Sequence, residues 1–146
     1  MTARRPRPVG INHVALQVDD LQRALAFWRA LFGEIDVDVS ERGMAFVDLG
    51  DQFVALAERG ASGAEPHFGL VVDDKEAARQ TLTEIGAETG RGRFLDTRDP
   101  SGNLIQIVQY DQIQFTKAPE VLRAMALELT KTAAALEELR ANGISP

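Results

Sequence analysis

The chain has 146 residues, a formal net charge of −6 and no cysteine. A chain of this length is expected to form a single domain. The lack of cysteine excludes disulfides, thiolate metal sites and cysteine nucleophiles, and it favours a reducing setting. The acidic balance argues against nucleic acid as the main partner, and no apolar run approaches the length of a membrane span. We therefore expect a soluble cytoplasmic protein.

The first predicted elements are a tail, a strand and a helix. Residues 1–8 form a basic, proline-broken tail that we expect to be solvated. Residues 9–18 alternate between two kinds of side chain, as a strand with two different faces does. Asp19 or Asp20 then caps a helix that ends at Gly33. One strand face carries His13, Ala15 and Gln17, whereas Val14, Leu16 and Val18 are expected to meet the helices. The apolar stripe of the helix comprises Leu21, Ala24, Phe27, Trp28 and Leu31.

The same pattern returns from residue 67, which indicates an internal repeat. The segment His13-Val-Ala-Leu-Gln-Val-Asp-Asp20 corresponds to His67-Phe-Gly-Leu-Val-Val-Asp-Asp74, so the two histidines of the chain share one position of the repeat. Asp73 or Asp74 caps the second helix, which ends at Gly86. Extended segments follow each helix, and each copy therefore reads strand, helix and about three strands.

Two further motifs complete the pattern: the first helix closes on Leu31-Phe-Gly33, and the second copy contains Asp99-Pro-Ser-Gly-Asn-Leu-Ile105. Together these motifs resemble the vicinal oxygen chelate superfamily, which includes glyoxalases, extradiol dioxygenases, fosfomycin-resistance proteins and bleomycin-binding proteins. The resemblance covers about residues 9–110. It implies an α+β fold in which two βαβββ modules, residues 9–60 and 61–110, form a curled mixed sheet around a cavity.

The resemblance also implies a set of metal-ligand positions. Metal-dependent members take one ligand from the first strand and one from the last strand of each module. Alanine cannot ligate, so the resemblance leaves three predicted ligands for one divalent ion, Zn, Fe, Mn or Ni. Gln106 stands where related sites carry glutamate, and three neutral ligands bind such ions more weakly than a set with one carboxylate. The four positions in this sequence are His13, Ala55, His67 and Gln106.

Asp96 is a candidate catalytic residue that bears on the missing charge. If residues 99–103 form a tight hairpin that pairs residue 98 with residue 104, Asp96 lies opposite Gln106 on the same face. There it can bind the metal, accept a hydrogen bond from the Gln106 amide, or act as a general base. The alternative is a simple ion pair between Asp96 and Arg98.

The remaining candidate site residues follow from strand parity. Ala45 and Ala57 are predicted to extend an apolar cavity wall in the first module. Tyr110 ends the last strand, and we take it as a candidate catalytic donor toward a substrate oxygen. Four residues are assigned to substrate binding: Gln17, Ala55, Phe94 and Arg98.

Residues 111–146 lie beyond the two modules. Pro119 opens an apolar stripe that runs to Gly143 and predicts one amphipathic helix of about 24 residues. This stripe is expected to fold back over the helices or to pack on a second subunit. We favour a homodimer, because small members of the family that the chain resembles commonly dimerise. Residues 113–115 are expected to close one mouth of the cavity.

Two functions remain open at this point. The resemblance implies a small-molecule enzyme, a lyase, transferase or dioxygenase, in which a metal chelates two adjacent substrate oxygens. Glyoxalase chemistry is disfavoured because positions 55 and 106 lack glutamate. A fosfomycin-type transferase requires a basic pocket, for which Arg98 and Arg93 are the candidates. The alternative is a metal-free protein that sequesters a hydrophobic or aromatic compound such as an antibiotic.

Overall fold

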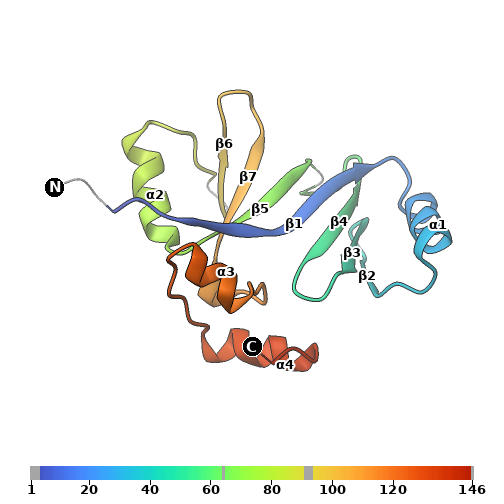
Figure 1. The fold of residues 1–146 in the computed structure, drawn as a ribbon. Coiled ribbons are helices and arrows are strands. Elements are labelled where there is room, and N and C mark those ends of the chain that lie inside the picture. Colours follow the sequence, from blue (N-terminus) through green and yellow to red (C-terminus); the bar gives the residue numbers. More distant parts are fainter. Residues whose placement is uncertain (1–3, 64, 91–93, 146) are drawn as a thin grey trace.

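A computed structural model gives the structure of residues 4–63, 65–90 and 94–145. Its centre is one open, seven-stranded mixed sheet with the order β2-β3-β4-β1-β5-β7-β6 (Figure 1). The strands are β1 (Pro8–Val18), β2 (Val37–Ser40), β3 (Met44–Asp48), β4 (Phe53–Glu58), β5 (His67–Val72), β6 (Leu95–Arg98) and β7 (Leu104–Gln109).

Two helices, α1 and α2, lie between strands in the chain order, and α3 and α4 come after the last strand. Figure 1 shows α1 and α2 near opposite ends of the sheet, with α3 and α4 gathered on one side. No helix within the described parts of the chain is long and apolar enough to cross a membrane. The helices are α1 (Leu21–Phe32), α2 (Lys75–Glu84), the 3₁₀ turn η1 (Tyr110–Gln112), α3 (Pro119–Ala124) and α4 (Ala133–Ala141).

The sheet is built from two similar halves, which confirms the predicted α+β fold. In each half the first strand pairs in parallel with the last, β1 with β4 and β5 with β7. The halves join where β1 pairs antiparallel with β5. After α2 the described residues contain two strands and one isolated bridge between Thr89 and Thr97. Over the described residues, the second half therefore has one strand fewer after its helix than the first half.

The side chains that cap the two long helices can now be identified. Asp20 accepts a hydrogen bond from the Arg23 backbone N–H, and Asp74 accepts one from the Ala77 N–H. Asp19 instead faces the guanidinium of Arg59 at 3.2 Å, with both side chains exposed. The second aspartate of each pair is thus the cap, which the sequence left open.

We expect Asp20→Ala to lower the free energy of unfolding by about 1 kcal/mol, because the first turn of α1 loses its side-chain acceptor. The matched control is Asp19→Ala, which removes only an exposed ion pair and should change stability by less than about 0.5 kcal/mol. Urea unfolding of both variants measures the difference. Equal losses in the two variants would show that Asp20 is not the cap.

The predicted stripe of α1 is confirmed in part, because Leu21, Ala24 and Trp28 pack in the cluster beneath the helix. Leu21 and Leu25 are buried against β3 and β4, whereas Phe27 is 64% exposed and Leu31 is 60% exposed. The helix offers two apolar rows, and the row of residues 21, 25 and 28 is the one that meets the sheet. The expected packing of Phe27 was therefore wrong, because a sequence with two apolar rows does not show which of them the sheet will select.

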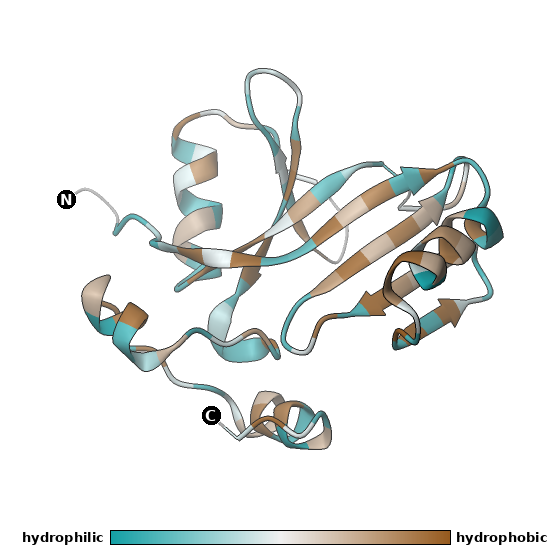
Figure 2. Ribbon diagram, turned by 45° about the vertical axis from the view of Figure 1, so that its right-hand side comes forward, coloured by the Kyte–Doolittle hydropathy of each residue, from teal (hydrophilic) through white to brown (hydrophobic). Residues whose placement is uncertain are grey.

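The outer face of β1 is also less covered than expected. Val14 and Leu16 are 40% and 41% exposed. The main contacts of α1 are with β4 and those of α2 are with β7, so these two side chains of the central strand stay partly exposed. Figure 2 shows the alternation of polar and apolar residues along the strands that predicts two faces but not what covers them.

The first hairpin corrects the predicted cavity wall. Asp48 pairs with Phe53 across a loop of residues 49–52, so Phe46 lies opposite Ala55 and Ala45 lies opposite Leu56. Ala45 is buried in the outer cluster beneath α1. The corresponding loop in the second half, residues 99–103, is one residue longer. Side chains alternate between the two faces of a strand, so a difference of one residue in loop length exchanges the faces. Ala45 therefore lies on the face opposite the cavity, and Phe46 lies at the cavity.

The region after the sheet contains two short helices and not the single long helix predicted. The chain turns at Ala126, which has φ of 55°, and the Leu127 N–H donates to the Leu122 carbonyl. This ending resembles a Schellman turn, in which the residue after the left-handed position makes an apolar contact. Leu127 is accordingly buried with Val9 and other apolar residues at one end of the sheet.

Lys131 holds this extension to the sheet. Its ammonium donates to the backbone carbonyl oxygens of Tyr110 and Ile113 and lies 3.4 Å from the Tyr110 ring centroid. Burial lowers the pKa of Lys131 to about 8. Of the predicted apolar stripe, Leu139 is buried within the chain, whereas Val121 is 38% exposed. Leu127 and Ala135, outside that stripe, are buried as well. The homodimer that we favoured remains a prediction.

Candidate functional site

A cavity of about 830 Å³ lies on the face of the sheet opposite α1 and α2. Residues of both halves line it, and the C-terminal extension adds Ile113, as the expected closure of one mouth requires. Its walls combine apolar side chains with a few polar groups, which is typical of sites for small organic molecules. The polar residues of its lining include Asn12, His13, Glu65, His67, Asp96 and Gln106.

The polar end of the cavity is organised by one cross-strand row. Each member of the row is the direct neighbour of the next in the sheet pairing, from β4 through β1, β5 and β7 to β6. Directly paired residues point to the same face of a sheet. The row consists of Phe53, His13, Gly69, Gln106 and Asp96.

Gly69 leaves room for the imidazole of His13. A Cβ atom on Gly69 would lie 2.2 Å from His13 Nδ1 and 2.2 Å from Asn12 Oδ1. The register of β1 against β5 shifts between Ile11 and His13, and both Asn12 and His13 line the cavity. Such an irregularity redirects side chains. The ring of His13 therefore lies against the backbone of the next strand, a contact that only glycine permits.

The two histidines lie beside each other across β1 and β5. Their ring centroids are 5.4 Å apart with planes nearly perpendicular at 85°. Nδ1 of His13 lies 2.9 Å from Asn12 Oδ1, and Nδ1 of His67 lies 2.8 Å from the Glu65 carbonyl oxygen. Because both partners are acceptors, each Nδ1–H donates. In the neutral form of each ring, Nε2 then has a lone pair for a ligand.

His13 is held in its neutral form. Burial first, and the nearby His67 second, lower the pKa of His13 to about 4. Its ring is also stacked on Phe53, with centroids 4.7 Å apart and planes 4° from parallel. A neutral, oriented imidazole is the form that binds metal ions, and no proton must leave it near neutral pH.

Asp96 and Gln106 are opposite each other, in the register expected from the hairpin. Oδ1 of Asp96 is buried and has no hydrogen-bond partner within the described chain. Arg98 instead pairs with Glu65, through contacts of 2.6 and 2.8 Å, and no ion pair joins Asp96 to Arg98 among the described residues. The alternative that these two residues pair with each other is therefore wrong.

The Glu65–Arg98 pair moves Arg98 away from its predicted place. Each partner shifts the other: the guanidinium lowers the pKa of Glu65, and the carboxylate raises the pKa of Arg98. Arg98 lines a smaller pocket of about 280 Å³ next to the main cavity, with Asp96 at their common boundary. Arg93, the other basic candidate, lies outside the described residues.

The structure separates the other predicted site residues. Ala55 and Phe94 line the cavity. Tyr110 does not: it is buried among apolar residues, its ring plane nearly perpendicular to that of Phe115, and burial raises its pKa. Gln17 pairs with Ala57 farther along β1 and is not among the lining residues. The sequence did not single out Asn12, Phe53 or Gly69, although a glycine inside a strand is a signal of close approach.

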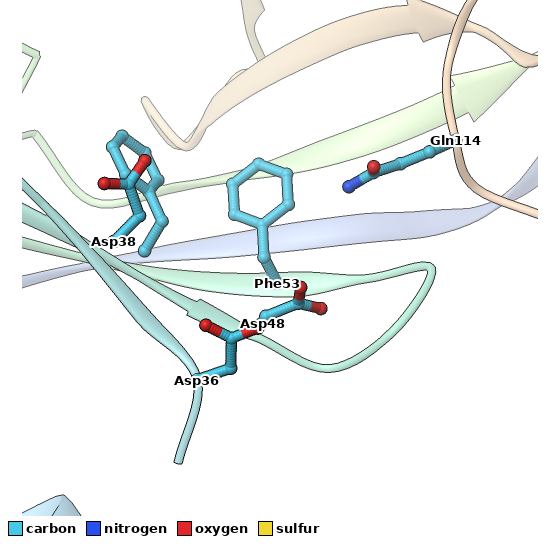
Figure 3. A pocket seen from close by; sticks show the side chains of 6 residues that line it. Asp36, Asp38, Asp48, Phe53 and Gln114 are labelled. Carbon is cyan, nitrogen blue, oxygen red and sulfur yellow. The ribbon is translucent and has the colours of Figure 1, made fainter. Parts of the chain in front are cut away.

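A further pocket of about 260 Å³ adjoins the main cavity, with which it shares Phe46 and Phe53. Figure 3 shows the three carboxylates of Asp36, Asp38 and Asp48 around Phe53, with Gln114 of the C-terminal extension across the opening. Gln114 is held in turn by Asn142, whose side-chain amide donates to it at 3.0 Å. This acidic pocket and the main cavity thus share one aromatic wall.

The donor set fits one divalent ion. With metal–nitrogen distances of about 2.0–2.1 Å, two imidazoles on one ion have ring centroids roughly 5 Å apart, close to the separation of His13 and His67. Over the described ranges, no three His, Cys, Asp or Glu side chains are grouped to hold a metal. Gln106, the third donor that the sequence predicts, is an amide and lies in the same cross-strand row as His13.

Comparison with known proteins gives consistent results. A family model described as the Glyoxalase/Bleomycin resistance protein/Dioxygenase superfamily matches residues 10–107. The metallothiol transferase FosB of Shouchella clausii is 27% identical over 115 residues, which are 67% of this chain and 78% of that protein.

Solved structures share the fold at lower identity. A xylose isomerase-like TIM barrel/4-hydroxyphenylpyruvate dioxygenase fusion protein matches with a TM-score of 0.61 and 19% identity, over 75% of this chain and 21% of the fusion protein. Methylmalonyl-CoA epimerase from Mycobacterium tuberculosis matches with a TM-score of 0.52 and 18% identity, over 84% of this chain and 97% of the epimerase. A methylmalonyl-CoA epimerase from Streptomyces coelicolor matches with a TM-score of 0.53 and 19% identity, over 77% of this chain and 100% of that chain.

Proposed function

The chain belongs to the Glyoxalase/Bleomycin resistance protein/Dioxygenase superfamily, and on that premise we propose that it is a divalent-metal-dependent enzyme acting on a small molecule with two adjacent oxygens. The observation that carries this proposal is the pair of imidazoles of His13 and His67, whose ring centroids lie 5.4 Å apart and whose Nδ1 atoms each lie at hydrogen-bonding distance from an oxygen. A relative named as a metallothiol transferase supports the same reading.

The roles follow from the positions of the residues. His13, His67 and Gln106 would hold the ion, which would be Zn, Fe, Mn or Ni. When bound, the ion supplies electrophilic stabilisation of negative charge on substrate oxygens. Phe94 and Ala55 contact the organic part of the substrate, and the apolar side chains of Phe46 and Phe53 keep water away from it. This division suits a ligand with one polar, chelating end and one apolar end.

Tyr110 and Arg98, the other predicted polar site residues, have at most a small role in the proposed enzyme. Tyr110 is in the apolar cluster, so we do not carry forward its role as a donor. Arg98 acts on the substrate only from the neighbouring pocket, where Glu65 already neutralises it. The enzyme that we propose therefore relies on the ion and on neutral donors, and it favours a substrate without a strongly anionic group. A reducing, cytoplasmic setting remains our expectation.

The test is elemental analysis of untagged protein together with His13→Ala and His67→Ala. We expect one equivalent of metal in the parent protein and at least a tenfold loss in each variant, because each variant removes one of the three proposed ligands. Gln17→Ala is the matched control, since Gln17 lies on β1 outside the cavity lining and should retain the metal. Parent protein that neither contains metal nor gains thermal stability from Zn²⁺, Mn²⁺, Ni²⁺ or anaerobic Fe²⁺ would contradict the proposal.

One observation favours a second function. The fourth ligand position is Ala55, which is buried, and His13 stacks on Phe53 as a ring in an apolar wall does. A metal-free protein that sequesters an aromatic or hydrophobic compound would use the same cavity, with the histidines and Gln106 as hydrogen-bonding groups. Metal-free parent protein that still binds aromatic probes with loss of binding in His13→Ala would establish this function instead.

A further inference from the structure

We propose that Asp96 is a positioning residue: it accepts a hydrogen bond from the side-chain amide of Gln106 and so turns the amide oxygen of Gln106 toward the two histidines. The inference rests on the proposed function, because it assigns the geometry of the third donor in the same site. It also explains how Gln106 can be a metal ligand at a position where a carboxylate would bind the ion more strongly.

The first observation is the state of the Asp96 carboxylate. Its Oδ1 atom is buried without a hydrogen-bond partner within the described chain. Leaving a buried acceptor unpaired costs roughly 1–3 kcal/mol, and more when it is charged. Such groups are rare in folded proteins and are found at functional sites. A donor is therefore expected at this atom in the working state of the site.

The second observation identifies the donor. Asp96 is the direct partner of Gln106 in the β6–β7 pairing, so the two side chains leave the sheet on the same face. Directly opposite residues have Cβ atoms about 4.5–5.5 Å apart, within reach of an amide on a longer side chain. On the other side, Gly90 confines the residue: a Cβ there would lie 3.2 Å from Asp96 Cβ, and the Gly90 N–H donates to the Asp96 carbonyl at 2.9 Å.

The third observation removes the competing roles. Arg98 is committed to Glu65, so Asp96 is not one half of that ion pair. The buried Oδ1 atom has almost no accessible surface, so this oxygen cannot touch a ligand in the cavity. This oxygen is therefore available to a neighbouring side chain and not to a ligand. A carboxylate behind a ligating group that fixes its orientation is a common arrangement at metal sites.

The chemistry of glutamine explains why orientation matters. An amide carries one acceptor and one donor group, and only the oxygen can face a cation. In the cross-strand row, Gln106 lies between Asp96 on one side and Gly69, followed by His13, on the other. When the amide nitrogen of Gln106 donates to Asp96, the amide oxygen therefore faces Gly69 and the His13 ring. The charge of Asp96 polarises the amide in the direction that strengthens this oxygen as a donor.

The first arm of the test measures Zn²⁺ and Mn²⁺ affinity by calorimetry for Asp96→Ala, Asp96→Asn and the control Glu88→Gln. Glu88 lines the same smaller pocket as Asp96 but lies outside the row, so its variant removes an equal charge nearby. We expect a 10–100-fold loss for Asp96→Ala, a smaller loss for Asp96→Asn, which keeps an acceptor oxygen, and a change below about twofold for Glu88→Gln. Equal effects of Asp96→Ala and Glu88→Gln would overturn the inference.

The second arm is a double-mutant cycle with Gln106→Glu. Alone, this substitution places a second carboxylate directly opposite Asp96, and like charges in that position repel. We expect Asp96→Asn to weaken metal binding in the parent but to tighten it by about tenfold when residue 106 is glutamate, because the asparagine amide then donates to that carboxylate. The same sign in both backgrounds would contradict the pairing.

The third arm needs no metal and separates this inference from the proposed function. In ¹⁵N spectra of metal-free protein, the side-chain NH₂ signals of Gln106, identified by their loss in Gln106→Glu, should shift in Asp96→Ala and stay in place in Glu88→Gln. Shifted signals without any metal binding would support the pairing and overturn the metal. Metal binding that His13→Ala abolishes, with unshifted signals, would overturn the pairing alone.

Discussion

Gly69→Ala should disable the site although it removes none of the polar groups of the site. The added Cβ would meet His13 Nδ1 and Asn12 Oδ1 at 2.2 Å, a distance that real Cβ contacts do not show. Either the imidazole leaves its place on Phe53 or β5 moves away from β1. We expect a loss of about 3 kcal/mol in the free energy of unfolding, near the upper end for overpacking, and at least a tenfold loss of metal or ligand affinity.

Urea unfolding and metal titration measure both effects. For the unfolding measurement the control is Gly90→Ala, since a Cβ there has a nearest contact of 3.2 Å and requires only a small adjustment. A second control is Gly69→Ala in a His13→Ala background, where part of the clash is gone and the added cost should fall. An unchanged cost in that background would show that the His13 ring is not what Gly69 accommodates.

Acid should destabilise the fold through His13. Its pKa is about 4 in the folded protein, against an ordinary value of 6.5. Between these values the unfolded chain binds a proton that the folded protein excludes, so stability falls as pH decreases from 6.5 toward 4. This difference between the two pKa values corresponds to about 3 kcal/mol in the free energy of unfolding. His13 is 6% exposed, so solvent screens little of it.

The measurement compares parent protein with His13→Phe by urea unfolding at pH 7 and pH 4. Phenylalanine keeps a ring beside Phe53 but cannot titrate, and the carboxylates of the chain titrate in both proteins. We expect the parent to lose about 2–3 kcal/mol more than the variant over this range. Parallel losses would mean that His13 accepts a proton in the folded state without cost.

Much of the site was predictable because it depends on strand parity. His13, His67 and Gln106 alternate with apolar neighbours, and a period of two assigns each residue to a face without knowledge of the partner strand. The motif of residues 99–105 fixed the second hairpin, and with it the position of Asp96 opposite Gln106. The first hairpin was misassigned because its loop is one residue shorter, and a shift of one residue exchanges the two faces.

The amino-acid sequence by itself determined the repeat, the α+β fold and the two histidines that face one cavity, because these depend on short-range periodicity and on caps. Tertiary structure alone decided which apolar row of α1 is buried, that the C-terminal stripe breaks at Ala126, and that Tyr110 belongs to an apolar cluster. It also decided that the ring of His13 lies against Gly69. Each of these outcomes depends on the distance between side chains far apart in the chain, which no local pattern encodes.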